Sequence, residues 1–564
     1  MNIFLTIIFT ALCLVSLYCF HMRRQNEKQA LRKKSKKAHT TAPAEPEGAW
    51  AVLLRYEKFI LPAIFLVGIL VRVSFFWDVP NGLNQDEASI AYDTYADLTY
   101  GMDRNGFHNP VYSVAWGSGH SSLYITLSKP FIALFGLNLV TARIVNVLFG
   151  CFALFAFYGI LKHMNGRRFA LLGLFLFAIT PWHIMLSRWG LECNLFPNVF
   201  LIATYFLVRG FDKQAFYPLS TAIYGLSLYA YGTSYMVVPV FLVLMAIYLL
   251  VYKKMSVKML LLSIGSFIVV AVPIGIFMII NSFGLPSLDL GWISFPKLVN
   301  GRYNSTVTVL QGNVLQNIWT NLKQAWHLLV YQDDGLIWNA IPGFGTYYLF
   351  SVPFMLLGLL RIIFRMVRGK GFRPEAVIAA SVLCALVLSS MSTLNINRAN
   401  FLLIPVVYCV ISGIMFVIDN MKYSAVTLVA VYLGAFLAFS GYYFTAYQKQ
   451  IGPAFFEGAG EAILYAGDQT DGTVYLSGDI NAPYIIAMFY EKTNPQEFLD
   501  TVDYLNPDSE CRFVSSFGRY VTGVPKRPAP NSAAYVASES EISRFSDELF
   551  DKTKFGYYYA VVPK

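Results

Sequence analysis

Residues 59–88 read FILPAIFLVGILVRVSFFWDVPNGLNQDEA. The first part of this stretch, Phe59–Trp77, is an apolar run of the roughly 20 residues that a helix needs to cross a bilayer, and the adjacent carboxylates Asp86 and Glu87 follow it. If the run spans a membrane, the acidic pair lies at the far boundary, where a charge is costly unless it has a partner or a task. We therefore expect Asp86 to be a general base at the mouth of a site that faces the lipid. The alternative is a helix N-terminus, with Asn84 or Asp86 capping a helix that starts near Ala88.

The composition of the whole chain agrees with a membrane protein. Of its 564 residues, 56% are hydrophobic and 13% are charged, whereas soluble domains carry about 25% charged residues. Repeated apolar runs of about 20 residues predict helices rather than the short alternating strands of a barrel, so we expect an all-α polytopic membrane protein. The net charge of +10 is explained by basic cytoplasmic loops and requires no nucleic acid. The seven cysteines show neither metal-ligand spacing nor a disulfide framework.

The N-terminal segment reads as a membrane anchor. Ile3–Phe20 is apolar and a basic run follows it, which reverses the order found in a cleaved signal peptide. We expect residues 1–20 to remain as an anchor with its N-terminus outside, and residues 21–58 to form a basic cytoplasmic linker that is loose at 40–48. The basic run could also touch anionic lipid. Its members are Arg23, Arg24, Lys28, Arg32, Lys33, Lys34, Lys36 and Lys37.

Further apolar runs bring the expected number of spans to about twelve. The most basic connecting loops all fall on the predicted cytoplasmic side. This agreement checks the number of spans, because one miscounted span would place every later loop on the wrong side. These loops are Lys162–Arg168, Arg209–Lys213, Lys253–Lys258 and Arg361–Arg373. The further runs lie at about 139–161, 168–186, 195–208, 216–231, 235–252, 258–280, 346–364, 375–391, 400–418 and 423–445.

Residues 59–447 thus form a predicted transmembrane catalytic domain with two long outer loops, 78–138 and 281–345. Within the first loop, Ser122–Phe135 has the pattern of a short helix that lies along the membrane surface. Residues 448–564 have ordinary soluble composition and predict a small extracytoplasmic α/β domain packed on the catalytic face. We expect its strands at 473–476, 512–515, 534–537 and 557–562, and a helix at 482–502 that breaks near Asn494.

Polar residues suited to chemistry gather in the predicted outer loops and at outer span ends. They come from segments that are hundreds of residues apart, so their convergence on one side of the membrane predicts a single catalytic face. Arg188 and Glu192 are four residues apart and would share one face of a helix. The candidates besides the acidic pair are His120, Tyr124, His183, Arg188, Glu192, Asp333, Asp334 and Arg398.

The pattern of these residues resembles the GT-C fold glycosyltransferases, in particular the protein O-mannosyltransferase and aminoarabinose-transferase group. The similarity covers roughly residues 59–420 and is most specific at 84–198. The motifs that carry it are Asp86-Glu87, His120-Ser121-Ser122-Leu123-Tyr124, Phe135-Gly136-Leu137-Asn138 with Arg143, Ser187-Arg188 with Glu192, and Arg398 with Pro405.

Enzymes of this group take a sugar from a polyprenyl phosphate and pass it to an acceptor outside the membrane. The resemblance therefore implies a glycosyltransferase of the cell membrane, whose acceptor is a hydroxyl of an extracytoplasmic protein, glycolipid or cell-wall polymer. Asp86, with Glu87, is then the catalytic base, and direct displacement inverts the sugar. Arg188 and Arg398 would bind the donor phosphate. The implied substrate-binding residues are His120, Tyr124, His183, Glu192, Asp333 and Asp334; no cofactor is certain, although the last two could hold a divalent cation.

Other interpretations are open at this point. A transporter or flippase of a lipid-linked saccharide would carry polar groups near the midplane of its spans, whereas here they gather at one end. A non-catalytic assembly protein with a glycan-binding tail is a third possibility. Arg188 and Glu192 could form an ion pair within one helix, Arg398 could mark a membrane boundary, and both histidines could be structural.

Overall fold

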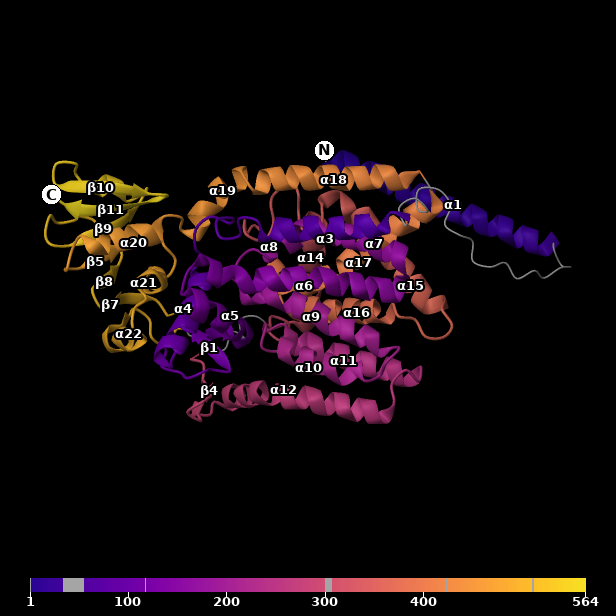
Figure 1. The fold of residues 1–564 in the computed structure, drawn as a ribbon, viewed down its shortest axis with the longest axis horizontal. Helices are drawn as coiled ribbons and strands as arrows, with labels where there is room; N and C mark the ends of the chain where they lie inside the picture. The colour runs from indigo at the N-terminus through magenta and orange to yellow at the C-terminus, as the bar shows by residue number, and fades with distance from the viewer. Residues whose placement is uncertain (1, 34–54, 117, 300–306, 422, 510–511) are drawn as a thin grey trace.

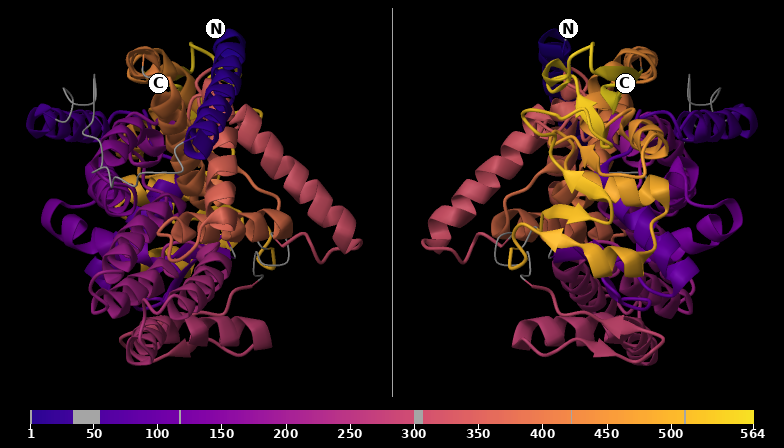
Figure 2. Two further views of the ribbon diagram at one scale, coloured as in Figure 1. Left: turned by 90° about the vertical axis from the view of Figure 1, so that its right-hand side faces the viewer. Right: turned by 90° about the vertical axis from the view of Figure 1, so that its left-hand side faces the viewer.

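The protein is a bundle of helices with a small sheet domain at one end (Figure 1). The computed structural model describes residues 2–33, 55–116, 118–299, 307–421, 423–509 and 512–564. Most helices of the bundle lie side by side along the long dimension of the molecule, and the C-terminal domain covers one end of them (Figures 1 and 2). This architecture confirms the predicted all-α polytopic membrane protein with a C-terminal α/β domain.

Helices occupy every predicted span. Seven of the described helices are long and apolar enough to cross a membrane, and the others are shorter or less apolar. The seven are α1 (Asn2–Lys33, apolar over Asn2–Asn26), α6 (Leu139–Asn165), α11 (Ser234–Val251), α12 (Val257–Phe283), α15 (Val352–Arg368, preceded by the 3₁₀ turn η1, Leu349–Ser351), α17 (Ile396–Asn420) and α18 (Ser424–Tyr443). The others are α3 (Glu57–Val73), α7 (Arg167–Ala178), α8 (Pro181–Leu186), α9 (Glu192–Gly210), α10 (Phe216–Ser227) and α16 (Ala376–Met391).

Three boundaries differ from the prediction. Helix α1 continues past Phe20 to Lys33, because the basic residues that follow the apolar run are good helix formers; the loose segment expected at 40–48 lies outside the described residues. The fourth predicted span is divided into α7 and α8 at Pro181, whose nitrogen cannot donate to a continuing helix. The outer loop 281–345 contains an amphipathic helix, α14 (Val314–Tyr331), and the short strands β3 (Leu288–Asp289) and β4 (Ser294–Phe295).

Helix α17 forms the centre of the bundle and is buried over most of its length. It packs closely on α15 through small residues from both helices. A Cβ at Gly413 would lie 2.0 Å from the Phe354 carbonyl oxygen, and a Cβ at Gly358 would lie 1.8 Å from that of Cys409. Glycine is therefore required at both positions, as is common where membrane helices approach closely.

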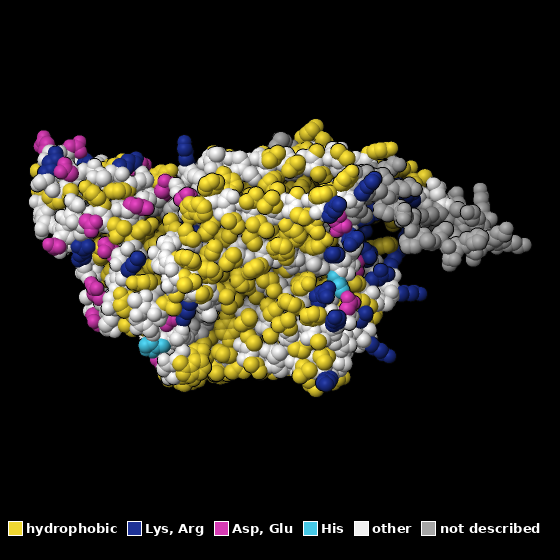
Figure 3. Space-filling view, in the orientation of Figure 1, with side chains coloured by type: hydrophobic (Ala, Val, Ile, Leu, Met, Phe, Trp, Pro, Cys, Tyr) yellow, Lys and Arg dark blue, Asp and Glu magenta, His cyan; other side chains and the backbone are white. Residues whose placement is uncertain are grey.

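The predicted cytoplasmic loops meet at one end of the bundle. Asp419, at the end of α17, pairs with Arg168 at 3.4 Å, and its backbone carbonyl accepts from Arg23 of α1. Arg365 of α15 pairs with Glu375, before α16, at 2.7 Å. Lys and Arg side chains gather at this end in Figure 3, a hydrophobic band covers the middle, and most visible Asp and Glu side chains lie on the opposite, C-terminal domain. This charge distribution fits a multi-pass membrane protein.

The C-terminal domain is built on a mixed sheet of seven strands. Strand β5 lies at the middle of the sheet and is parallel to its neighbours β8 and β9. The four predicted strands and the break in the predicted helix are present, but the sequence patterns missed β6, β8 and β10, which are short or polar. The elements are α19 (Ala446–Ile451), η2 (Gly452–Phe455), α20 (Ala459–Asp468), β5 (Val474–Leu476), α21 (Pro483–Glu491), α22 (Pro495–Thr501), β6 (Asp503–Tyr504), β7 (Val514–Phe517), β8 (Tyr520–Thr522), β9 (Ala534–Ser538), η3 (Ile542–Arg544), β10 (Phe550–Phe555) and β11 (Tyr558–Pro563).

The first outer loop joins this domain to the bundle. It consists of α4 (Gln85–Tyr100), a hairpin of β1 (Tyr112–Ala115) and β2 (Ser118–Ser121), and α5 (Ser122–Phe135), which has the predicted bounds. Helix α4 packs against both α5 and α21. The acidic pair at the start of α4 thus lies between the ends of the spans and the C-terminal domain.

Candidate functional site

Glu87 is a buried structural carboxylate. Its two oxygens accept from the Nε and Nη2 atoms of Arg143 at 2.8 and 2.9 Å, and Oε1 also accepts from the Gly190 backbone N–H at 2.6 Å. The same guanidinium donates to the carbonyls of Pro80 and Gly82. Together these contacts tie the start of α4 and the segment after α3 to α6 and to the loop before α9. These contacts occupy both oxygens of Glu87. A catalytic role for Glu87 stays a prediction that they do not favour.

Asp86 has a different environment, although it is the next residue. It is partly exposed, while Glu87 is fully buried. The side chain of Asn84 accepts from the Asp86 N–H at 2.9 Å and forms a capping box with Glu87. Asn84 is therefore the N-cap, and the helix starts at Gln85 rather than near Ala88. The N-terminal position also stabilises the charge of the Asp86 carboxylate.

A buried His120–Glu192 pair lies near Asp86. Nδ1 of His120, on β2, is 3.2 Å from Oε1 of Glu192, at the start of α9, and both side chains are less than 10% exposed. Burial alone would lower the pKa of His120, but the charge and hydrogen bond of Glu192, with a smaller contribution from Asp86, raise it above its ordinary value. The Nε2 atom is buried and makes no hydrogen bond to a described residue. This nitrogen can therefore donate to a bound group while Glu192 holds the ring.

A second polar cluster, which the sequence prediction missed, adjoins His120. Arg104 lies 4.7 Å above the Trp116 ring and 3.5 Å from the Asp93 carboxylate. The edge of Trp116 meets the His120 ring at a centroid distance of 5.7 Å. Burial and the nearby Asp93 charge raise the pKa of Asp103 to about 8. The only signal in the sequence was the concentration of charged residues within one aromatic outer loop.

Arg188 does not lie on one helix with Glu192, as its spacing had suggested. It occupies the turn between α8 and α9, and α9 begins only at Glu192. Its guanidinium donates to backbone carbonyls in the last turn of α3 and just after it, with the shortest bonds, 2.7 Å, to Val71 and Ser74, and lies 4.8 Å above the ring of Phe444. Arg188 thus fixes the end of α3, and donor phosphate binding by it stays a prediction that these contacts do not favour.

Arg398 is more available to a ligand than Arg188. It lies in the first turn of α17 and is partly exposed, and among the described residues its side chain donates one hydrogen bond, to the Thr393 carbonyl at 3.2 Å. Two residues later, Asn400 donates to the Cys193 carbonyl at 3.2 Å, directly after Glu192. The start of α17 and the start of α9 therefore lie together at the same end of the bundle as the acidic pair.

Asp333 and Asp334 lie in the loop that follows α14, and Asp334 joins this loop to the start of α17. Asp333 accepts from the Gly335 N–H, and Asp334 accepts from the Asn339 side chain and from the Ile396 N–H, both at 2.8 Å. The described part of the chain contains no group of three or more His, Cys, Asp or Glu side chains that could hold a metal ion. These contacts give the Asp334 carboxylate a structural role, and they do not support a cation bound by Asp333 and Asp334.

Two further candidates are packed inside the protein. His183 is fully buried, with Nδ1 2.7 Å from the Nη2 atom of Arg72 and Nε2 3.0 Å from the Asn198 side chain. The Tyr124 hydroxyl donates to the Ala142 carbonyl at 2.8 Å. Both side chains have protein partners, so their predicted roles in substrate binding have no support from these contacts.

An apolar groove of about 590 Å³ runs along the surface beside this end of the bundle. Leu70 and Ser74 on one side and Phe436 and Phe444 on the other belong to its walls, which come from α3, the segment after it and the end of α18. Arg188 lies behind the groove, because it bonds the Ser74 carbonyl and covers the Phe444 ring.

Comparisons with known proteins agree with this description. Residues 122–277 match the family model described as dolichyl-phosphate-mannose-protein mannosyltransferase, which confirms the resemblance to glycosyltransferases over that part of the chain. No curated protein matches the chain.

Several solved structures match the chain at low identity and with TM-scores below 0.5. ArnT from Cupriavidus metallidurans bound to undecaprenyl phosphate is 13% identical, with 91% of this chain and 98% of that chain covered and a TM-score of 0.48. The oligosaccharyltransferase AglB from Archaeoglobus fulgidus, in complex with an inhibitory peptide and a dolichol-phosphate, is 12% identical over 77% of this chain and 64% of that chain, with a TM-score of 0.47. The protein O-mannosyltransferase Pmt1–Pmt2 complex of S. cerevisiae bound to the sugar donor is 15% identical over 45% and 38%, with a TM-score of 0.30.

Proposed function

We propose that the protein is an integral membrane glycosyltransferase that moves a sugar from a polyprenyl-phosphate donor to an acceptor hydroxyl on the extracytoplasmic side. The observation that carries the proposal is the partly exposed Asp86 carboxylate beside the buried His120–Glu192 pair, at the end of the bundle opposite the basic loops. The match of residues 122–277 to a mannosyltransferase family supports the same conclusion.

The charge distribution supports the proposed orientation. The basic end faces the cytoplasm by the positive-inside rule, so the acidic pair and residues 448–564 lie outside. In this arrangement residues 59–447 form the catalytic domain, and the anchor at 1–20 leads into a cytoplasmic segment at 21–58.

The two parts of the donor would lie in different environments. Its isoprenoid tail remains in the bilayer, against a surface such as the apolar groove between α3 and α18, while its phosphate and sugar emerge at the boundary. Arg398 is the cation best placed for the phosphate, since most of its guanidinium N–H groups make no hydrogen bond to a described residue. A planar guanidinium can pair with two phosphate oxygens at once, which stabilises the charge that grows on the leaving group.

Asp86 is the proposed general base. It accepts the proton of the acceptor hydroxyl as the hydroxyl oxygen forms a bond to the anomeric carbon. The bond from that carbon to the phosphate oxygen breaks with its electron pair, and polyprenyl phosphate leaves. A single displacement of this kind inverts the configuration of the sugar. His120 and Glu192 border the space in which the sugar would lie.

The test is turnover of a panel of polyprenyl-phosphate hexoses by the full-length protein in lipid nanodiscs. Asp86→Asn keeps the size of the side chain and removes the base, so we expect a loss of roughly 10²- to 10⁴-fold. Asp471→Asn, at an exposed carboxylate of the C-terminal domain, is the matched control and should behave as wild type. Undiminished turnover by Asp86→Asn would refute the assignment of the base, and a wild type that consumes none of the donors would refute the proposed activity.

A further inference from the structure

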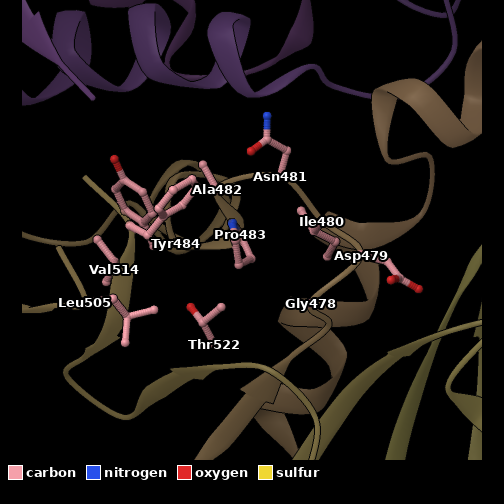
Figure 4. Close-up of a pocket in the computed structure, with 11 residues that line it drawn as sticks. Gly478, Asp479, Ile480, Asn481, Ala482, Pro483, Tyr484, Leu505, Val514 and Thr522 are labelled. Atoms are coloured by element: carbon pink, nitrogen blue, oxygen red, sulfur yellow. The ribbon is translucent and has the colours of Figure 1, made fainter. Parts of the chain in front are cut away.

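A cavity in the C-terminal domain lies at the carboxyl ends of two parallel strands. Its volume is about 320 Å³, and it is lined by the segment Gly478–Tyr484, which connects β5 to α21, and by Thr522, the last residue of β8. Leu505, Phe513 and Val514 complete the lining (Figure 4). Crevices outside the carboxyl ends of parallel strands are frequent binding sites, and the volume suits one small group rather than an extended ligand.

The lining carries no cationic side chain and offers groups that suit a carbohydrate. The side chains of Asn481 and Thr522 make no hydrogen bond to any described residue, so an amide and a hydroxyl are available to a ligand. Leu505 and Phe513 supply apolar surface, and Phe513 is 52% exposed. In Figure 4, Thr522 and Asn481 lie on opposite sides of Pro483, and the Asn481 amide points away from Thr522.

Charge argues against an anionic ligand. None of the lining residues is Lys or Arg, and the one charged residue is Asp479. The hydroxyls of Ser538 and Ser540 both donate to its carboxylate and lower its pKa, so it keeps its negative charge. A phosphate or carboxylate would meet a like charge here, whereas a sugar ring has hydroxyls for the polar groups and an apolar face for the aromatic ring.

The cavity is connected to the candidate site by a row of three rings. Tyr484, in its wall, lies 6.3 Å from Trp116 between ring centroids, and Trp116 lies 5.7 Å from His120. Tyr484 and Trp116 come from the two domains that meet where α21 packs on α4. Two ring contacts therefore separate the cavity from the His120 region.

We propose that this cavity binds a neutral sugar unit of the acceptor, distant from the hydroxyl that reacts. The role as an acceptor subsite rests on the proposed function, whereas sugar binding by the cavity does not. The cavity selects saccharide-bearing acceptors and holds them while the transfer takes place near Asp86.

The direct test is saturation-transfer NMR with the full-length protein in nanodiscs, without donor, and methyl hexopyranosides as probes. We expect transfer to the sugar protons in wild type. Asn481→Ala and Thr522→Val should each weaken it roughly fivefold, the effect of losing one ligand hydrogen bond. Thr522→Ser keeps the hydroxyl and should bind as wild type, as should Thr553→Val, the matched change on β10. Unchanged binding in both cavity variants, no binding in wild type, or tighter cavity-dependent binding of glycerol phosphate would each overturn the proposal.

A second measurement separates this inference from the proposed catalysis. Asp86→Asn should bind the hexosides like wild type, and Thr522→Val should still release sugar from the donor to water at the wild-type rate while transfer to saccharide acceptors falls. If Asp86→Asn keeps full turnover, the catalytic proposal fails and the sugar site stands. If Thr522→Val loses hexoside binding without any change in acceptor use, the cavity binds sugar but is not an acceptor subsite.

Discussion

The Arg143 guanidinium holds both oxygens of the Glu87 carboxylate, at 2.8 and 2.9 Å, while Asp86, one residue earlier, remains partly exposed. Successive residues of an α-helix point about 100° apart. The first turn of α4 therefore directs one acid into the protein and the other toward the surface. The two carboxylates, which look equivalent in the sequence, therefore have different environments: Glu87 is buried against Arg143, and Asp86 is the one for which we propose a role in chemistry.

Glu87→Gln should destabilise the protein. It leaves the buried Arg143 charge without its carboxylate, which costs about 3–5 kcal/mol when one partner of a buried pair is removed. Thermal unfolding in detergent should show a markedly lower midpoint for Glu87→Gln and a midpoint close to wild type for Asp86→Asn. Equal midpoints for the two variants would contradict the division of roles.

Arg398→Ala should weaken donor binding without unfolding the protein. Hydrogen bonds to a charged group contribute about 1.5–3 kcal/mol, which corresponds to a loss of roughly 10- to 150-fold in affinity for polyprenyl phosphate. Arg188→Lys is the contrasting variant, because a single ammonium cannot replace the several carbonyl contacts of that guanidinium. We expect it to lower the unfolding midpoint. If Arg188→Lys instead weakens donor binding at unchanged stability, then Arg188 and not Arg398 binds the donor phosphate.

The sequence predicted the parts of the fold that depend on local pattern. The apolar runs located the spans, the basic loops located one end, and α5 has the bounds expected from its periodicity. Helix α14 and strand β10 were missed because they carry many polar residues. For the candidate site, the sequence predicted that distant segments converge. The hydrogen bond from Asn400 to Cys193 is an example, because it joins the start of α17 to the start of α9. The sequence could not predict that the partners of Arg188 are backbone carbonyls, since a carbonyl leaves no mark in the pattern of side chains.

His120→Gln should change the pH dependence of turnover. The raised pKa of His120 means that the folded protein favours the protonated ring, paired with Glu192, and that the ring loses its proton as the pH rises through the raised value. Turnover of the wild type should therefore fall on the alkaline side through that titration. The variant should show lower turnover at neutral pH, and its turnover should not fall on the alkaline side through this titration. A pH profile of identical shape in both proteins would exclude a role for the His120 proton in turnover.

Asp103→Asn should make the protein more stable at alkaline pH. Oδ1 of Asp103 accepts from the N–H groups of Asn105 and Phe107, and Oδ2 is buried without a hydrogen bond to a described residue. The folded pKa, about 8, lies above the usual value of about 4. The folded state thus binds the proton more tightly, and stability falls as the pH rises from about 4 to about 8.

The amide introduced by Asp103→Asn would mimic the protonated acid and remove this dependence. Unfolding midpoints measured at pH 6 and pH 9 should differ less in Asp103→Asn than in wild type. Asp93→Asn is the control, because it leaves Arg104 buried beside a neutral partner and should lower the midpoint at both pH values. If Asp103→Asn lowers the midpoint equally at pH 6 and pH 9, the carboxyl is ionised throughout this range and its charge supports the fold.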